Sequence, residues 1–117
     1  MSATTIQIPA DHVEAIRTSL RDRRGDAGDE AREVERLLAQ FASAMPADAA
    51  RDREVTGSRS VLWTAVYDVL CAAAEQLAED CNDYCRGAVA PDSARAAVAR
   101  VGTSLELLIA LGAPPGR

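Results

Sequence analysis

The stretch from Gly57 to Gly87 constrains the fold most, because it predicts one long helix with a signal at each end. In an α-helix successive residues lie about 100° apart around the axis. At that spacing the larger apolar side chains of this stretch fall on one arc, which covers close to half of the helix circumference. The arc holds Leu62, Trp63, Val66, Tyr67, Leu70, Ala73, Ala74, Leu77, Cys81, Tyr84 and Cys85. So wide an arc is typical of a helix that neighbours contact on two sides, so we expect the central helix of a bundle.

Capping residues define the ends of this helix. Gly57 with the serines that follow it predicts the start, and Gly87 with Pro91 soon after predicts the end. From Arg59 to Arg86 the helix would rise by roughly 40 Å.

The core that this chain can build is thin. Of its 117 residues 48% are apolar, but 24 of those 56 residues are Ala, and Leu, Ile, Val and Phe together number 24. That share is just above the level at which disorder is suspected, so the isolated monomer should be marginally stable. Alanine permits close helix packing, and burial against a second copy would supply the missing apolar contact, so we expect a homodimer.

The overall charge disfavours two classes of partner. The net charge is -5, which argues against non-specific binding to nucleic acid or to an anionic membrane. Residues 1–8 show no signal-peptide pattern, and no run of 18 apolar residues predicts a membrane span. We therefore expect an acidic cytoplasmic protein with reduced thiols.

The N-terminal half predicts a short arm and two helices. Ile6 and Ile8 alternate with polar residues, which indicates an extended arm, and we find no second strand for it to pair with. A helix should run from Pro9 to about Arg24 with Val13, Ile16 and Leu20 as its apolar stripe. Residues 21–30 are polar and contain two glycines, so we place a turn there, although one continuous helix over residues 10–45 is the alternative.

The rest of the chain completes an all-α fold. A second helix should begin at Asp29 and end before Pro46, and residues 46–57 should form a polar connection. In a last helix from Pro91 to Gly112, the a/d spacing of antiparallel bundle packing is followed by Ala94, Val98, Val101, Leu105 and Leu108. We expect a small antiparallel bundle of about four helices over residues 10–112, an arm over residues 1–9 and a disordered tail over residues 113–117.

Cys81 and Cys85 are the candidates for metal or thiol chemistry. Two thiols one helical turn apart could provide half of a tetrahedral metal site, with the other ligands coming from another helix or chain. Free cysteines are more often small buried apolar residues, and that is our expectation here. We predict no metal and no cofactor.

We find no sequence pattern of an enzyme. The single histidine, His12, lies in the first turn of a helix beside Asp11, where we expect it to be exposed. There is no Gly-x-Ser-x-Gly motif and no glycine-rich phosphate loop.

Aromatic and aliphatic residues of the last two helices are the candidates for an interface. Trp63 and Tyr67, one turn apart, should belong to the core or anchor a dimer. With them we assign Val98, Val101, Leu105 and Leu108 to the interface. An alanine-lined space beside Trp63 could instead hold a small apolar ligand.

The order strand, helix, turn and helix in residues 4–45 resembles the opening of ribbon-helix-helix repressors. The resemblance implies a two-chain ribbon that reads DNA, with Thr5 and Gln7 facing the bases. The second helix departs from this pattern, because Asp26, Asp29 and Glu30 at its start would repel phosphate. Our first hypothesis is therefore a non-enzymatic bundle that acts by self-association and protein–protein interaction, with the DNA-binding regulator and the thiol or metal protein as alternatives.

Overall fold

The structure is a computed structural model that describes residues 3–23, 30–42, 52–88 and 90–113. These residues form four helices and one two-stranded antiparallel sheet. In chain order the elements are β1 (Ala3–Ile8), α1 (Ala10–Arg23), α2 (Ala31–Ala42), β2 (Arg53–Ser58), α3 (Arg59–Cys85) and α4 (Pro91–Leu111). The chain is thus mostly helical, as predicted. The expected N-cap Asp29, the expected helix end at Met45 and the tail beyond Ala113 lie outside the described residues.

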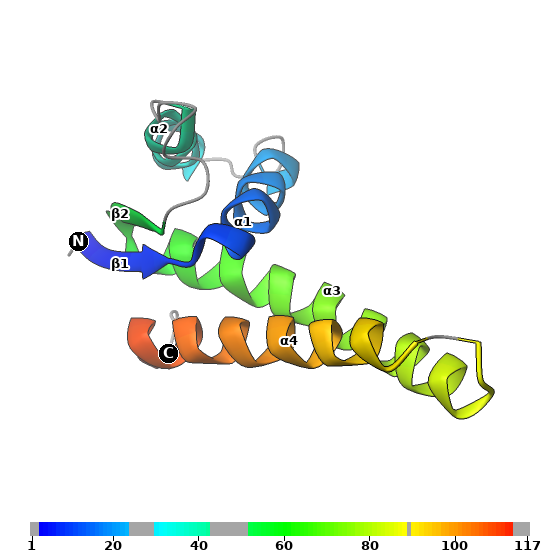
Figure 1. Ribbon diagram of the computed structural model, residues 1–117. Coiled ribbons are helices and arrows are strands. Elements are labelled where there is room, and N and C mark those ends of the chain that lie inside the picture. The colour runs from blue at the N-terminus through cyan, green and yellow to red at the C-terminus, as the bar shows by residue number, and fades with distance from the viewer. Residues whose placement is uncertain (1–2, 24–29, 43–51, 89, 114–117) are drawn as a thin grey trace.

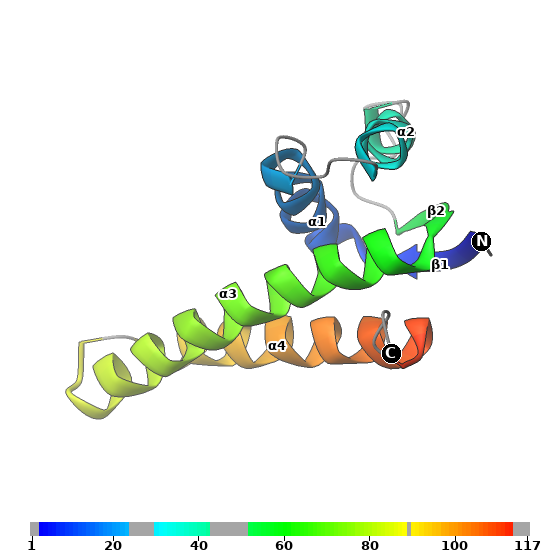
Figure 2. The ribbon, with the colours of Figure 1, turned by 180° about the vertical axis from the view of Figure 1, so that it is seen from behind.

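The helices α3 and α4 form a long antiparallel hairpin, and the other elements gather at one end of it (Figure 1). In both views α1 and α2 are seen nearly end-on while the hairpin lies across the picture (Figure 2). The described residues therefore confirm four helices, but they do not confirm one antiparallel bundle that contains all four. The structure describes two separate helices over residues 10–23 and 31–42, and the predicted turn over residues 21–30 lies mostly outside the described residues.

The strand β2 was not predicted. It pairs antiparallel with β1, and Ile6 lies opposite Val55. The sequence predicts a connection over residues 46–57, because the segment is polar and rich in alanine. The side chain of Val55 and the backbone of Gly57 are nevertheless buried, which is the alternation of a strand with one covered face. The arm therefore pairs within its own chain.

Polar contacts attach α2 to the outer edge of β2. The carboxylate of Glu33 accepts a hydrogen bond of 2.7 Å from the backbone N–H of Ser58 and a bidentate pair from Arg36. The Arg36 guanidinium is the main cause that lowers the pKa of Glu33, and burial partly opposes it. Arg53 donates a hydrogen bond of 2.7 Å to the carbonyl oxygen of Phe41, which satisfies an acceptor at the C-terminal end of α2.

The hydrophobic core lies where the sheet, α1 and α2 meet the first half of α3. Its most buried members are Ile8, Ile16, Leu20, Val34, Leu37, Val55, Val61, Leu62, Ala65 and Val66. From α4, Leu107 and Leu111 join this core. The first half of α3 thus contacts neighbours on two sides, as predicted, but the predicted arc was only partly right. Val61, Ala65 and Val69 are buried although they were not assigned to the arc, whereas five of its members are exposed: Tyr67, Ala74, Cys81, Tyr84 and Cys85.

Candidate interaction surface

The outer half of the hairpin has no buried core of its own. Within α3 and α4, both fully described, no residue after Ala73 and none before Ser104 is buried. These segments are 12 and 13 residues long, so they extend by about 18 Å beyond the core. Helices in proteins obtain most of their stability from packing an apolar face against a neighbour. In this half of the hairpin the side chains of both helices are therefore exposed or only half-buried.

One side of the hairpin, which we call the hairpin face, carries large apolar side chains that are exposed or half-buried. This face lies on the side of the hairpin away from α1. The α3 residues that line a groove together with α1 are on the opposite face of the α3 helix. By helical spacing, the six residues that the sequence assigned to an interface fall on this face: Trp63, Tyr67, Val98, Val101, Leu105 and Leu108. Val98 is 57% exposed, Leu105 46% and Tyr67 44%, and the other three are half-buried. Ile109, which the sequence analysis missed, is 78% exposed on the same stripe of α4.

A ring stack and hydrogen bonds hold the aromatic part of this face at the open end of the hairpin. The rings of Trp63 and Tyr67 stack with centroids 5.2 Å apart and an interplanar angle of 15°. The indole N–H of Trp63 donates to the carbonyl oxygen of Gly112 at 3.2 Å, and Arg59 donates to the carbonyl oxygens of Leu111 and Ala113. These donors satisfy carbonyls that the end of α4 would otherwise leave unpaired.

The a/d prediction for α4 was wrong in its phase. Val98 and Leu105 are exposed, whereas Ser104, Leu107 and Leu111 are buried. The buried or half-buried stripe is Ala94, Ala97, Val101, Ser104, Leu108 and Leu111, which shares three positions with the predicted one. The helix therefore carries two neighbouring apolar stripes, and only one of them contacts α3.

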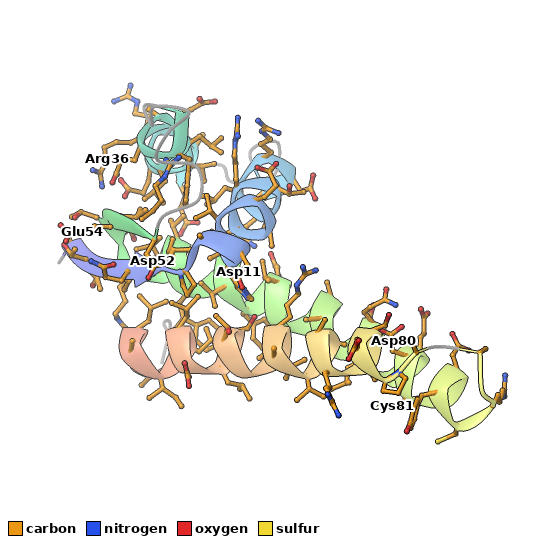
Figure 3. All side chains as sticks on the ribbon, viewed as in Figure 1. Asp11, Arg36, Asp52, Glu54, Asp80 and Cys81 are labelled. Atoms are coloured by element: carbon orange, nitrogen blue, oxygen red, sulfur yellow. The ribbon has the colours of Figure 1, made fainter. Side chains whose placement is uncertain are left out.

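The cysteines are exposed, which contradicts the expectation that they are small buried residues. Cys71, Cys81 and Cys85 are all free and exposed (Cys81 is labelled on the projecting end of the hairpin in Figure 3). The described residues bring no group of three or more His, Cys, Asp or Glu side chains together around a candidate metal. A hydrogen bond with the Cys71 sulfur is the main cause that raises the pKa of Tyr67.

His12 is buried, and the prediction of an exposed histidine was wrong. Its Nε2 lies 2.8 Å from the hydroxyl oxygen of Ser104, which in turn donates to the carbonyl oxygen of Arg100. Since a serine hydroxyl has one proton to donate, Ser104 accepts from His12, and the neutral ring carries its proton on Nε2. Burial is the main cause that lowers the pKa of His12, the charge of Arg100 lowers it further, and Asp11 opposes the shift.

The residues of the DNA-binding alternative lie on β1. Thr5 and Gln7 are exposed, and the Thr5 hydroxyl contacts the Thr56 hydroxyl at 2.7 Å. The strand pairs with β2 of the same chain, whereas the ribbon-helix-helix arrangement pairs it with a second chain.

Among the described residues one helix, α3, is long enough and apolar enough to cross a membrane. This is weak support for a membrane span, since the central helix of a water-soluble protein has the same length and composition. A third of its most apolar 18-residue stretch is buried inside the fold.

Comparisons with protein families, with curated proteins and with solved structures found no significant match to this chain.

Proposed function

We propose that this protein is non-enzymatic and acts by self-association and protein–protein contact, with the hairpin face as the interface of a homodimer. The observation that carries this proposal is the outer half of the hairpin, which has no buried side chain in α3 after Ala73 or in α4 before Ser104. A second hairpin laid on the first would give both segments the apolar neighbour that stable helices need. Two such hairpins together would make an antiparallel four-helix bundle, built from two chains instead of the single chain that the sequence predicted.

The size of the hairpin face suits a second copy of this chain. From Trp63 to Cys85 the face is about 33 Å long, and two helices packed 8–10 Å apart are about 20 Å wide. The flat area of this face is on the order of 600 Å². Side chains that project from it add to the accessible surface, which brings it close to the roughly 800 Å² that each partner buries in a stable interface. A twofold axis would make the aromatic and aliphatic parts of this one patch serve both subunits.

Light scattering after gel filtration, with reductant and over a wide concentration range, tests the proposal. We expect twice the chain mass of 12.4 kDa, since the interface depends on packing and not on disulfides. Leu105→Glu places a charge in the hairpin face and should give the monomer mass. Ala99→Glu adds the same charge at an exposed position of α4 outside the face and should leave the dimer intact. A monomer at every concentration, or equal effects of the two variants, would exclude this interface.

A further inference from the structure

A groove lies on the side of the hairpin opposite the hairpin face. It has a volume of about 850 Å³ and is enclosed by α1, α3 and α4. Small side chains of the two hairpin helices line it, and we call these four alanines its floor: Ala72 and Ala73 of α3 and Ala96 and Ala97 of α4. Its lining residues on α4 all precede Ser104, and Gln76 and Asp80 of α3 follow Ala73, so an occupant would also contact the outer half of the hairpin.

The rim of this groove is strongly acidic. Its lining contains five carboxylates and one basic side chain, Arg100; the carboxylates are those of Asp11, Glu14, Asp22, Asp68 and Asp80. Arg17 pairs with Glu14 at 3.5 Å and Arg23 with Asp68 at 3.3 Å. For the other three carboxylates no ion pair occurs with any residue that the structure describes. Asp11 and Asp80 are labelled in Figure 3 on α1 and on the projecting part of α3. The rim thus has an excess of negative charge around an apolar floor.

We propose that this acidic groove binds a cationic amphipathic helix of a partner protein, with its apolar face on the alanine floor and its Arg or Lys side chains at the rim. The α3 residues of the groove run from Asp68 to Asp80, about 18 Å, which is the length of three helical turns. Alanine lets helix axes approach closely. The acidic rim attracts cations and repels phosphate, which separates this partner from nucleic acid.

A helix fits this floor better than an extended peptide does. An extended peptide needs hydrogen-bond partners for its backbone, and alanine side chains on two regular helices provide none. A helix satisfies its own backbone groups and presents side chains alone. This site is independent of the proposed dimer, because it uses the other side of the hairpin.

Binding of synthetic peptides to the full chain tests the proposal by fluorescence anisotropy. The probe is a labelled amphipathic peptide of about 15 residues with Ala and Leu on one face and Lys and Arg on the other. We expect saturable binding of one peptide per chain, weakened about tenfold or more between about 50 mM and about 500 mM NaCl. A peptide with the same apolar face and Glu in place of the cations should not bind. Equal binding of the two peptides, no binding of the basic one, or displacement of the basic peptide by spermine at similar concentration would overturn the proposal.

Matched variants locate the site. Asp22→Asn with Asp80→Asn should weaken peptide binding about tenfold, whereas Glu75→Gln with Glu79→Gln, the same charge change on exposed residues of α3 outside the groove, should stay within about twofold. Equal losses in the two pairs would mean attraction by net charge alone and would overturn the proposal.

Two variants that change side-chain size instead of charge test the same site if the charge variants fold poorly. Ala96→Phe fills the groove and should abolish binding, whereas Ala99→Phe on the exposed side of the same helix should not. Binding that survives Ala96→Phe would exclude the groove. The mass of each variant by light scattering reports the dimer separately, so a failure of the groove is distinguishable from a failure of self-association.

Discussion

The side-chain amide of Gln40 pairs with the backbone of Thr56 as a neighbouring strand would. Its Nε2 donates to the Thr56 carbonyl oxygen at 2.7 Å, and its Oε1 accepts from the Thr56 N–H at 3.0 Å. These backbone groups point away from β1, toward the free edge of the sheet. One glutamine of α2 therefore satisfies and covers part of that edge, which would otherwise be open to pairing with another chain.

Gln40→Ala should lower the free energy of unfolding by about 1–2 kcal/mol, because it removes two hydrogen bonds from part-buried backbone groups. Urea unfolding followed by circular dichroism measures the change. Gln76→Ala is the matched control, since Gln76 is exposed and its amide N–H bonds only the exposed end of Asp80. Losses of the same size in both variants would contradict this role of Gln40.

Gly57 is required by the packing of α2 on β2. A Cβ atom at this position would overlap the side chain of Leu37 and lie 2.9 Å from the Glu33 carboxylate. Gly57→Ala should therefore destabilise the fold by about 1–3 kcal/mol, as overpacking does. Gly102→Ala is the contrast, because a Cβ there meets open space on a helix, and this change should stabilise by about 0.5–1 kcal/mol. Thermal unfolding of the two variants should shift in opposite directions, and a neutral Gly57→Ala would show that α2 does not sit as described.

Burial of His12 should make stability depend on pH near neutrality. Its pKa is lower in the native chain than in the unfolded chain, so the unfolded chain binds the proton more tightly. The contribution of His12 is complete above its unfolded pKa of about 6.5 and is lost as the pH falls from there toward the lower native pKa.

Urea midpoints between pH 7.5 and pH 5.5 measure this dependence. His12→Gln keeps a side-chain N–H that can donate to Ser104 but has no proton to gain, so its midpoint should vary less over the same range. Both proteins contain the same carboxylates, so the difference between their pH dependences reports the contribution of His12 alone. An identical slope in the two proteins would show that His12 does not control the dependence.

The limits of the hairpin helices could be predicted almost to the residue, because Gly87, Pro91 and Gly112 act locally on the backbone. Gly87 and Gly112 indeed have positive φ angles of 77° and 92°. The elements that were missed depend on residues far apart in sequence. The strand β2 exists because β1 pairs with it and α2 covers it, and His12 is buried because Ser104, 92 residues later, accepts its hydrogen bond.

The face that α4 turns toward α3 was ambiguous for a different reason. A stripe through Val98 and Leu105 and a stripe through Ser104 and Leu111 both follow helical spacing, and they share Ala94, Val101 and Leu108. The more apolar stripe was the natural choice for the core. In the structure the less apolar stripe is buried or half-buried, and of the more apolar stripe Val98 and Leu105 are left exposed.

The exposed stripe makes a prediction about local stability in the outer half of the hairpin. If the hairpin face closes on a second copy, backbone amides in residues 74–85 and 91–103 should exchange slowly, and their protection should increase with protein concentration. In Leu105→Glu these amides should lose protection while those around Ile16 and Val66, which lie in the core, keep it. Hydrogen exchange followed by mass spectrometry at two concentrations measures both effects.

The control for this experiment is Ala99→Glu, which adds the same charge to α4 outside the hairpin face and should exchange like the unmodified chain. Protection that is independent of concentration and unchanged in Leu105→Glu would mean that the outer half is stable within one chain. Loss of protection throughout the molecule would mean instead that the substitution unfolds the core. A loss confined to the outer half, together with monomer mass, is the result that a dimer through the hairpin face requires, because only those segments depend on the second copy for their packing.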